Sequence, residues 1–219
     1  MALNKLKFNS LNVTPVAGKT VGFNSSANGL EATFSGGAMT FIKKLTASSS
    51  STLSFVDGSS DVVLDNTYKE YIFIFKDIHP ATDGAELTFN MSVDSGSNYN
   101  VTKTSTHFTA MHNESDSDTQ FFYSTSGDLA QSTNFQIMLR NLGNDNDQSG
   151  SAILHIFNPS STTFVKHFIC TSSSYAADNY ARNGFTAGYG NTTSAIDAIQ
   201  FKMSSGNIDA GTITLYGIN

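Results

Sequence analysis

The sequence predicts an all-β protein, an antiparallel β-sandwich with jelly-roll-like connectivity that follows an irregular N-terminal segment. Short apolar runs rich in Phe, Tyr, Ile and Val follow one another, and clusters of Gly, Asn, Asp or Ser separate nearly all of them. In two of the runs, 87–93 and 199–203, apolar and polar residues alternate, which is the period of a strand with one buried face. The 17 Phe and 8 Tyr can fill a core although only 14% of the residues are charged, so the chain is not of the disordered class.

The first 38 residues differ in pattern from the rest. Their apolar residues are spaced irregularly and are interrupted by Pro15 and Gly18. Residues 1–38 are therefore predicted either as an arm that contacts a neighbouring subunit or as the first, irregular strands of the domain, and 39–219 as the sandwich. The candidate subunit-contact residues are Leu3, Leu6, Phe8, Leu11 and Val13.

From residue 40 onward, strand candidates follow at short spacing with turn-forming residues between them, as is typical of a sandwich or jelly roll. No repeat of fixed period indicates a solenoid or a propeller. The only segments that admit a helical turn are 126–132 and 194–199. The predicted strands are 40–46, 52–57, 68–78, 86–94, 106–113, 119–125, 134–142, 151–159, 163–173, 183–190, 195–205 and 211–218.

Two pairs of these runs are predicted to form hairpins. In 68–94, two β-prone runs are joined by a connection that contains Pro80 and the Asp83-Gly84 pair, which are turn signals. The alternation of its second run predicts that Thr88, Asn90 and Ser92 face water. Residues 199–218 are predicted as a closing hairpin with an eight-residue loop.

Charge and hydropathy exclude two classes of partner. The net charge is −6 and no dense Lys/Arg cluster exists, so we expect no binding to nucleic acid. No apolar run approaches the roughly 20 residues that span a bilayer, and the N-terminus lacks the apolar region of a secretory signal. We expect a soluble protein that is made in a cytoplasm and has no membrane partner.

The residue patterns give no catalytic constellation, and we expect neither an enzyme nor a cofactor. The chain has no G-x-S-x-G elbow. Cys170 and His167 are three residues apart in a predicted strand, which places their side chains on opposite faces. Cys170 lies in an apolar run, where a small buried thiol is expected. Paired carboxylates for glycoside hydrolysis are not identified by their spacing.

The chain offers two weak metal candidates. Residues 145–150 match the first half of an EF-hand loop, but the twelfth position is Ile156 instead of the bidentate Glu. A polar turn and a weak Ca²⁺ site both remain open there. His107 and His112 are five apart, hence on opposite faces of a strand unless it bends, and no zinc site is predicted.

Tyrosines in or beside polar segments are the remaining functional signal. Such rings stack on a sugar face or anchor a protein interface when they are exposed, and they are simply strand ends when they are half-buried. The segment 172–190 is predicted as a long loop rich in Gly and Tyr. The candidate ligand-contact residues in it are Tyr175, Tyr180 and Tyr189.

Two stretches resemble virion structural proteins of tailed bacteriophages, particularly marine ones. One is YKEYIFIFKDIHPATDGAELTFNMSVDSGSNY at 68–99, which is similar to a pattern of Y-x-x-Y, a strand, an I-x-P-x-x-D-G turn and a strand ending in S-x-D-x-G-x-x-Y. The other is IQFKMSSGNIDAGTITLYGI at 199–218, similar to an S-G-N-I-x-x-G-x-x-x-L-Y-G-I ending.

The resemblance implies a β-sandwich module of phage heads, tails or fibres, with no catalytic residues to carry over. The expected function is a non-enzymatic virion protein, made in the bacterial host cytoplasm, that decorates the capsid or belongs to the tail or fibre apparatus. Its expected partners are other virion proteins and further copies of itself, because phage parts are symmetric. The alternative is a carbohydrate-binding adhesin of the tail-fibre type for a host surface glycan, and a glycan-cleaving depolymerase is a third reading.

Overall fold

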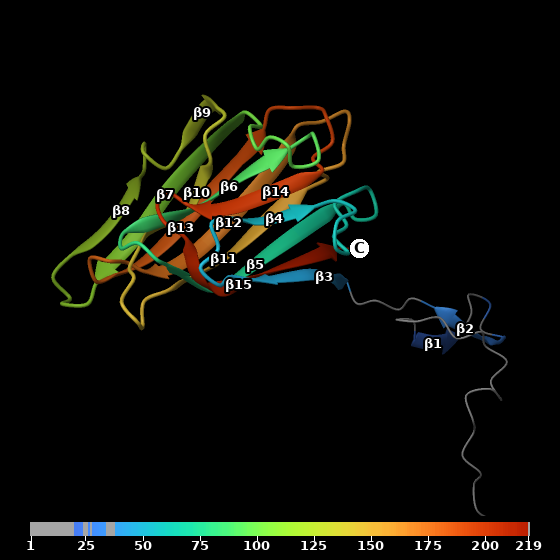
Figure 1. The fold of residues 1–219 in the computed structure, drawn as a ribbon, viewed down its shortest axis with the longest axis horizontal. Helices are drawn as coiled ribbons and strands as arrows, with labels where there is room; N and C mark the ends of the chain where they lie inside the picture. Colours follow the sequence, from blue (N-terminus) through green and yellow to red (C-terminus); the bar gives the residue numbers. More distant parts are fainter. Residues whose placement is uncertain (1–19, 24–25, 27, 34–37, 219) are drawn as a thin grey trace, which may run out of the picture. The chain divides into compact units, whose positions relative to one another are not determined.

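The computed structural model describes residues 20–23, 26, 28–33 and 38–218 (Figure 1). The chain divides into two compact units, Met1–Met39 and Thr40–Asn219. The described residues form strands, turns and bends but no helix, and the strands pair antiparallel. The all-β antiparallel fold class is confirmed.

The first unit contains a small two-stranded sheet. Strand β1 (Thr20–Phe23) pairs antiparallel with β2 (Leu30–Thr33), with Phe23 opposite Leu30. A part of the segment predicted as irregular is thus paired. The candidate subunit-contact residues lie outside the described residues: Leu3, Leu6, Phe8, Leu11 and Val13.

The second unit is a sandwich of two sheets. The larger one has the order β3-β15-β5-β11-β12-β13-β7-β8, and β9 also pairs with β7. The smaller one has the order β10-β6-β14-β4. The large sheet comprises β3 (Met39–Thr46), β5 (Glu70–Pro80), β7 (Lys103–Asn113), β8 (Thr119–Tyr123), β9 (Leu129–Ser132), β11 (Gly150–Phe157), β12 (Lys166–Tyr175), β13 (Tyr180–Gly190) and β15 (Ile208–Ile218), and the small sheet β4 (Leu53–Val56), β6 (Ala85–Ser92), β10 (Gln136–Leu142) and β14 (Ala198–Met203).

Each predicted strand from residue 40 onward overlaps one of these strands. Neither segment that the sequence admits as a helical turn forms a helix. The first begins with a hydrogen-bonded turn at 125–127 and continues as strand β9, and the second leads into β14 at Ala198.

The strand order is that of a jelly roll. Consecutive strands form four ribbons, β3–β4, β5–β6, β10–β11 and β14–β15, and each ribbon places one strand in each sheet. The ribbons have the same neighbours in both layers, so the large sheet begins β3-β15-β5-β11 while the small sheet runs β4-β14-β6-β10. The remaining strands, β12, β13, β7, β8 and β9, extend the large sheet beyond β11.

This topology corrects the two predicted hairpins. β5 and β6 are joined by the short connection 81–84 but lie in different sheets, and the same holds for β14 and β15, which are joined by 204–207. The ribbons pair with each other instead, β5 with β15 and β6 with β14. The same tight turn can join two strands of one sheet or two strands of different sheets. The turn residues therefore could not show which of these two arrangements forms.

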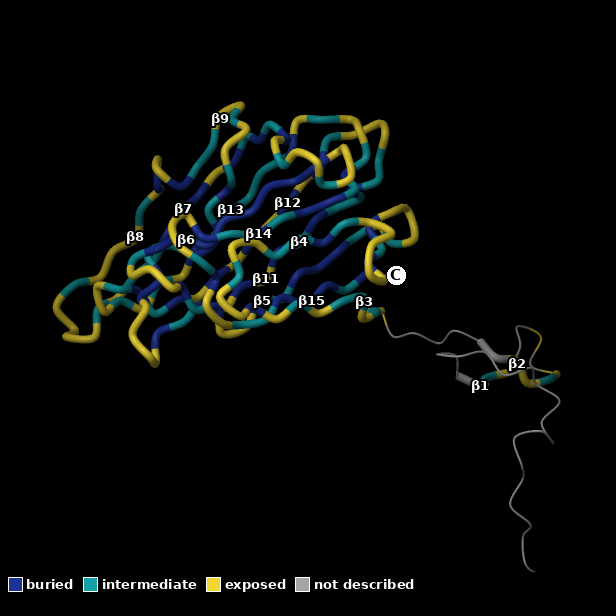
Figure 2. The backbone as a smooth tube through the Cα atoms, viewed as in Figure 1, coloured by how far each residue is buried: buried dark blue, intermediate teal, exposed yellow. Residues whose placement is uncertain are grey.

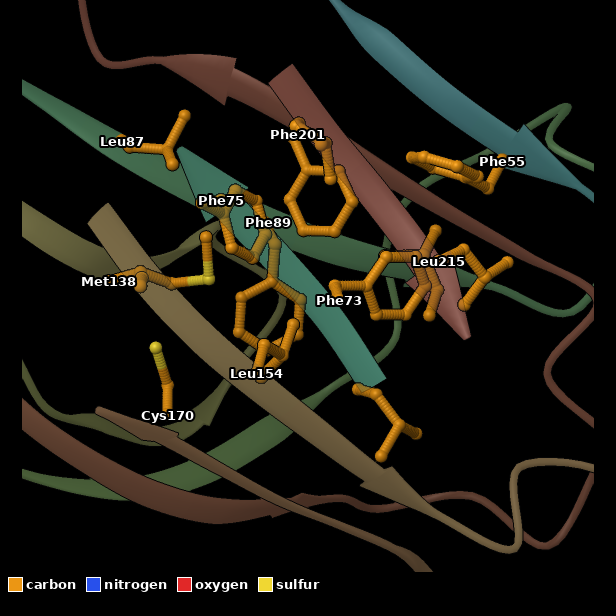
Figure 3. Close-up of a cluster of buried hydrophobic side chains, with 14 of the residues drawn as sticks. Phe55, Phe73, Phe75, Leu87, Phe89, Met138, Leu154, Cys170, Phe201 and Leu215 are labelled. Atoms are coloured by element: carbon orange, nitrogen blue, oxygen red, sulfur yellow. The ribbon is translucent and has the colours of Figure 1, made fainter. Parts of the chain in front are cut away.

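The core between the sheets is built on aromatic side chains (Figure 3). Phe201 on β14 is fully buried, and its ring centroid lies 5.0 Å from that of Phe75 and 5.3 Å from that of Phe73. Phe55 on β4 and Phe89 on β6 lie around the same ring. Edge-on aromatic contacts of this kind add about 0.5–1.5 kcal/mol each beyond the burial of their area. The residues of these central strands are mostly buried, and many of the exposed residues lie in the connections (Figure 2).

The polar face of β6 is buried, which corrects the prediction that it faces water. Thr88, Asn90 and Ser92 are each at most 5% exposed. The Asn90 Nδ2 group donates to the carbonyl oxygens of Tyr99 and Thr133, both at 2.8 Å. The connections that follow β6 and precede β10 therefore cover this face, and their backbone oxygens satisfy its polar groups.

Candidate functional site on the outer face of the large sheet

The outer face of the large sheet carries a broad row of apolar and aromatic side chains. Alternate residues of β11 and β12 are buried in the core, so the residues between them face outward. Phe108 stacks on Phe185 with ring centroids 5.0 Å apart, and Phe121 lies edge-on to Phe108 at 5.7 Å. The side chains in register along this row are Tyr123, Phe108, Phe185, Thr171, Ile153 and Ile74.

Several of these side chains are more exposed than apolar side chains on a monomer usually are. Phe121 is 74% exposed, Tyr123 51% and Ile153 40%. Large contiguous apolar patches on soluble proteins mark surfaces that pack against a partner. The row is a candidate interaction surface.

An apolar hollow lies at one end of this outer face. Its volume is about 500 Å³, and Phe157, His167, Ile169, Ala187 and Tyr189 contribute to its lining. The rings of His167 and Tyr189 lie beside each other on neighbouring strands, with centroids 6.1 Å apart and their planes tilted by 60°. The predicted ligand residue Tyr189 therefore belongs to a real concavity, and that concavity is predominantly apolar.

A second, more polar hollow lies at the opposite end of β12 and β13. It encloses about 420 Å³ and is lined by His112, Glu114, Ser173 and Tyr175, among others. A hydrogen bond to the Glu114 carboxylate raises the pKa of the Tyr175 phenol. His112 Nε2 lies 3.0 Å from Asp116 Oδ1. A ring face, a carboxylate and hydroxyl groups in one hollow can contact a polar ring-shaped ligand.

The three predicted tyrosines do not form one site. The predicted loop 172–190 is a hairpin, in which β12 and β13 are joined by the four-residue turn 176–179. Tyr175 and Tyr180 flank that turn, whereas Tyr189 lies nine residues further along β13, about 30 Å away at the rise of a strand. The alternation of β13 also places Tyr180 and Tyr189 on opposite faces, and the Tyr180 hydroxyl donates to Asp118 Oδ2 at 2.9 Å.

A polar cluster that no sequence pattern indicated lies inside the sandwich, where β10 covers the extended part of the large sheet. His107 is fully buried, and its Nδ1 lies 2.8 Å from Thr186 Oγ1. Burial lowers the pKa of His107 to about 4. A cavity of about 10 Å³ beside His107, Arg140 and Arg182 has room for about one water molecule. The cluster binds β10 to the sheet and is closed to larger ligands.

The remaining sequence candidates have structural surroundings. Cys170 is buried in the core, and burial raises the pKa of its thiol to about 12. In the 145–150 loop, the Asp145 carbonyl oxygen accepts from the Gln148 N–H at 2.9 Å and lies 3.2 Å from His79 Nε2. These contacts are those of a polar turn. Across the side chains that the structure describes, no three His, Cys, Asp or Glu gather to hold a metal ion.

Comparisons with known proteins provide no relative to set beside this geometry. No family model matches the sequence, and neither the curated proteins nor the solved structures include a match. In the described ranges, no helix has the length and apolar character needed to cross a membrane.

Proposed function

We propose that this chain is a non-enzymatic structural protein of a bacteriophage virion, which decorates the capsid or forms part of the tail or fibre apparatus through contacts between subunits. The observation that carries the proposal is the outer face of the large sheet. Tyr123 and Ile153 are exposed along one register of strands, and Phe121 is exposed on the same face beside Tyr123. Burying these side chains against a neighbour is favourable at roughly 25 cal/mol per Å² of apolar area.

The positions of the two phage-like stretches support the virion assignment. The stretch 68–99 includes β5 and β6, and the stretch 199–218 includes β15 and most of β14. Although more than 100 residues separate them, these strands are paired in both sheets. The resemblance thus covers one contiguous unit of the sandwich, as expected for a shared module, and not two unrelated turns.

Deletion of residues 2–16 tests the proposal. We expect the shortened protein to be absent from assembled particles while its far-ultraviolet circular dichroism and melting temperature match those of the full chain, because the sandwich core begins after residue 39. The measurement is the copy number of the protein in purified particles. Normal incorporation of the shortened chain would refute a role for the N-terminal segment in subunit contact.

A second candidate function, recognition of a host surface glycan, is favoured by the polar hollow at Tyr175. The half-buried Tyr175 ring, next to Glu114 and His112, suits a sugar that stacks and accepts or donates hydrogen bonds. On this reading, Tyr175→Ala lowers glycan binding roughly tenfold, and Tyr189→Ala in the apolar hollow changes it less. Tyr123→Ala, at an exposed tyrosine of the same face, is the control. A glycan array without a signal for the unmodified protein favours the purely structural role.

A further inference from the structure

Strand β8 ends the large sheet with an open edge. It pairs with β7 on one side, and within the described ranges no strand pairs with its other side. Its sequence, TQFFY, contains neither Pro nor Lys nor a register shift, the usual features that protect an edge strand from pairing with another chain. Thr119, Phe121 and Tyr123 are exposed. This edge is a ready acceptor for an additional strand.

The register identifies the backbone groups that an added strand would meet. At the two ends of β8, the Ser124 N–H donates to the His107 oxygen at 2.8 Å and the Asn113 N–H donates to the Asp118 oxygen at 3.1 Å. In an antiparallel pair, hydrogen-bonded and non-hydrogen-bonded residues alternate. The N–H and C=O groups of Thr119, Phe121 and Tyr123 therefore point away from β7, toward the open edge.

The charges around β8 select the kind of strand that fits there. No Lys or Arg occurs in the sequence between Lys103 and Arg140, and the connections at the two ends of β8 carry four carboxylates. The Arg140 guanidinium, which donates to Ser124 Oγ and Ser126 Oγ just after β8, is a cation close to the strand and offsets only part of this negative charge. Two β8 strands related by a two-fold axis would bring these acidic connections together, and like charges oppose that pairing. A basic segment with alternating apolar residues meets the opposite charge instead. The acidic residues are Glu114, Asp116 and Asp118 before the strand and Asp128 after it.

We infer that the open edge of β8 accepts residues 2–16 of another copy of this chain as an added strand. The inference rests on the proposed function and names the surface that receives the N-terminal segment. Residues 1–30 contain three Lys and no Asp or Glu, and in the run KLKF the apolar Leu6 and Phe8 alternate with Lys5 and Lys7. Addition of a strand to an exposed sheet edge combines backbone hydrogen bonds with side-chain selection.

The alternation of lysine and apolar residues in KLKF determines which side chains share a face of the added strand. In a strand added at this edge, the alternation would place Leu6 and Phe8 beside Phe121 and Tyr123 on the outer face, and Lys5 and Lys7 on the other side. From there, the long lysine side chains would reach toward the acidic connections. Because each copy both donates a segment and accepts one at a different surface, the contact is head-to-tail and builds rings or longer arrays.

Cross-linking between two differently tagged full-length copies tests this contact. One copy carries Asn9→Cys and the other Gln120→Cys, and a short bismaleimide joins thiols that lie close together. The native Cys170 stays unmodified because it is buried, with its pKa raised. The matched control replaces Gln120→Cys by Thr171→Cys, which is exposed on the outer face of the same sheet but away from the edge. We expect the 9–120 product to exceed the 9–171 product roughly tenfold, because the added strand raises the local concentration of the thiols.

A backbone variant provides an independent measurement. Phe121→Pro removes an N–H that points to the open edge, whereas Phe121→Ala keeps that N–H and removes the ring. In Gln120→Cys copies, we expect Phe121→Pro to abolish the 9–120 product and Phe121→Ala to reduce it only in part. Unchanged cross-linking in the Pro variant would overturn the strand-addition geometry.

Two other results would also overturn the inference. One is a 120–120 product in place of the 9–120 product, which indicates that two β8 edges pair with each other. The other is equal yield from the 9–120 and 9–171 pairs. Deletion of residues 2–16 could prevent incorporation although no 9–120 product forms. That result would support the proposed function and refute β8 as the acceptor, so the two failures are distinguishable.

Discussion

At the scale of single residues, Lys103 is the most unusual group in the described part of the molecule. It is fully buried, and its ammonium donates to Asn90 Oδ1 at 2.6 Å and to the Val101 oxygen at 2.8 Å. Neither partner is a carboxylate, and burial lowers the pKa of Lys103 to about 7. Lys166, which is in register with Lys103 through Gly190, is also buried with a lowered pKa.

These shifts predict a stability that rises with pH. Between about pH 7 and pH 10, the unfolded chain still holds the Lys103 proton whereas the folded chain does not, since the unfolded pKa is about 10.4. The free energy of unfolding therefore increases across this window and receives no further change from Lys103 below it. Urea unfolding of the unmodified protein from pH 6 to pH 10 measures the slope.

Replacement of Lys103 isolates its share of that slope. We expect Lys103→Met to flatten the rise between about pH 7 and pH 10 and to leave the smaller contribution of Lys166. Lys44→Met, at an exposed lysine of β3, is the control and should keep the original slope. An undiminished slope in Lys103→Met would contradict a neutral, buried Lys103.

The burial of single side chains was predictable from the sequence for Cys170 but not for Lys103. Cys170 was predicted as a buried thiol because its neighbours are apolar, and that prediction is confirmed. Lys103 gave no such signal, because a lysine at the start of a strand is usually exposed. Its burial depends on Asn90 and Val101, and only the folded chain brings the Asn90 side chain to it.

At the scale of elements, the bend of β15 against β5 depends on a glycine. The register of the two strands shifts near their junction, and Gly211 has a φ of 112° opposite Asp77, whose φ is 52°. A Cβ on Gly211 would lie 2.6 Å from the Asp77 oxygen and 2.8 Å from Ile78 Cα. The atoms nearest to this Cβ all belong to the backbone of β5, so no flexible side chain can move aside to make room for it.

We therefore expect Gly211→Ala to lower the free energy of unfolding by roughly 1–3 kcal/mol, through its strained φ and through the clash with β5. The control is Gly58→Ala, since Gly58 has a φ of 72° but no atom within 4 Å of an added Cβ. Thermal and urea unfolding of the two variants measure the difference. If both variants lost the same free energy of unfolding, the close approach of Gly211 to Asp77 would contribute nothing to stability.

The elements themselves were largely predictable, and their partners were not. Alternation and turn residues located strands such as β11 and β12, because the period of two is a local property. The same local pattern predicted a water-facing side for β6, which is wrong because Asn90 bonds to distant backbone oxygens. For Tyr175, Tyr180 and Tyr189, abundant Gly and Ser predicted a loop where β12 and β13 form a hairpin.

At the scale of the whole molecule, the sandwich is a jelly roll whose large sheet has been lengthened on one side. The inserted strands β7, β8 and β9 lie between β6 and β10 in the chain, and β12 and β13 lie between β11 and β14. The extension carries most of the lining of the two hollows described above and the open edge of β8. The stretches 68–99 and 199–218 lie in the jelly roll itself, whereas Phe121, Tyr123, the two hollows and the open edge lie largely on the insertions.

The ribbon β14–β15 has a consequence for how the protein is made. It lies between β4 and β6 in one sheet and between β3 and β5 in the other, so both layers are divided until residues 198–218 are in place. These residues are synthesised after the strands that lie on both sides of them. Folding that depends on such distant pairing is slow and leaves unpaired strands exposed in the meantime. The two parts of each sheet therefore join only after residues 198–218 have been synthesised, and a chain without these residues leaves β3 and β4 separated from the rest of the two sheets.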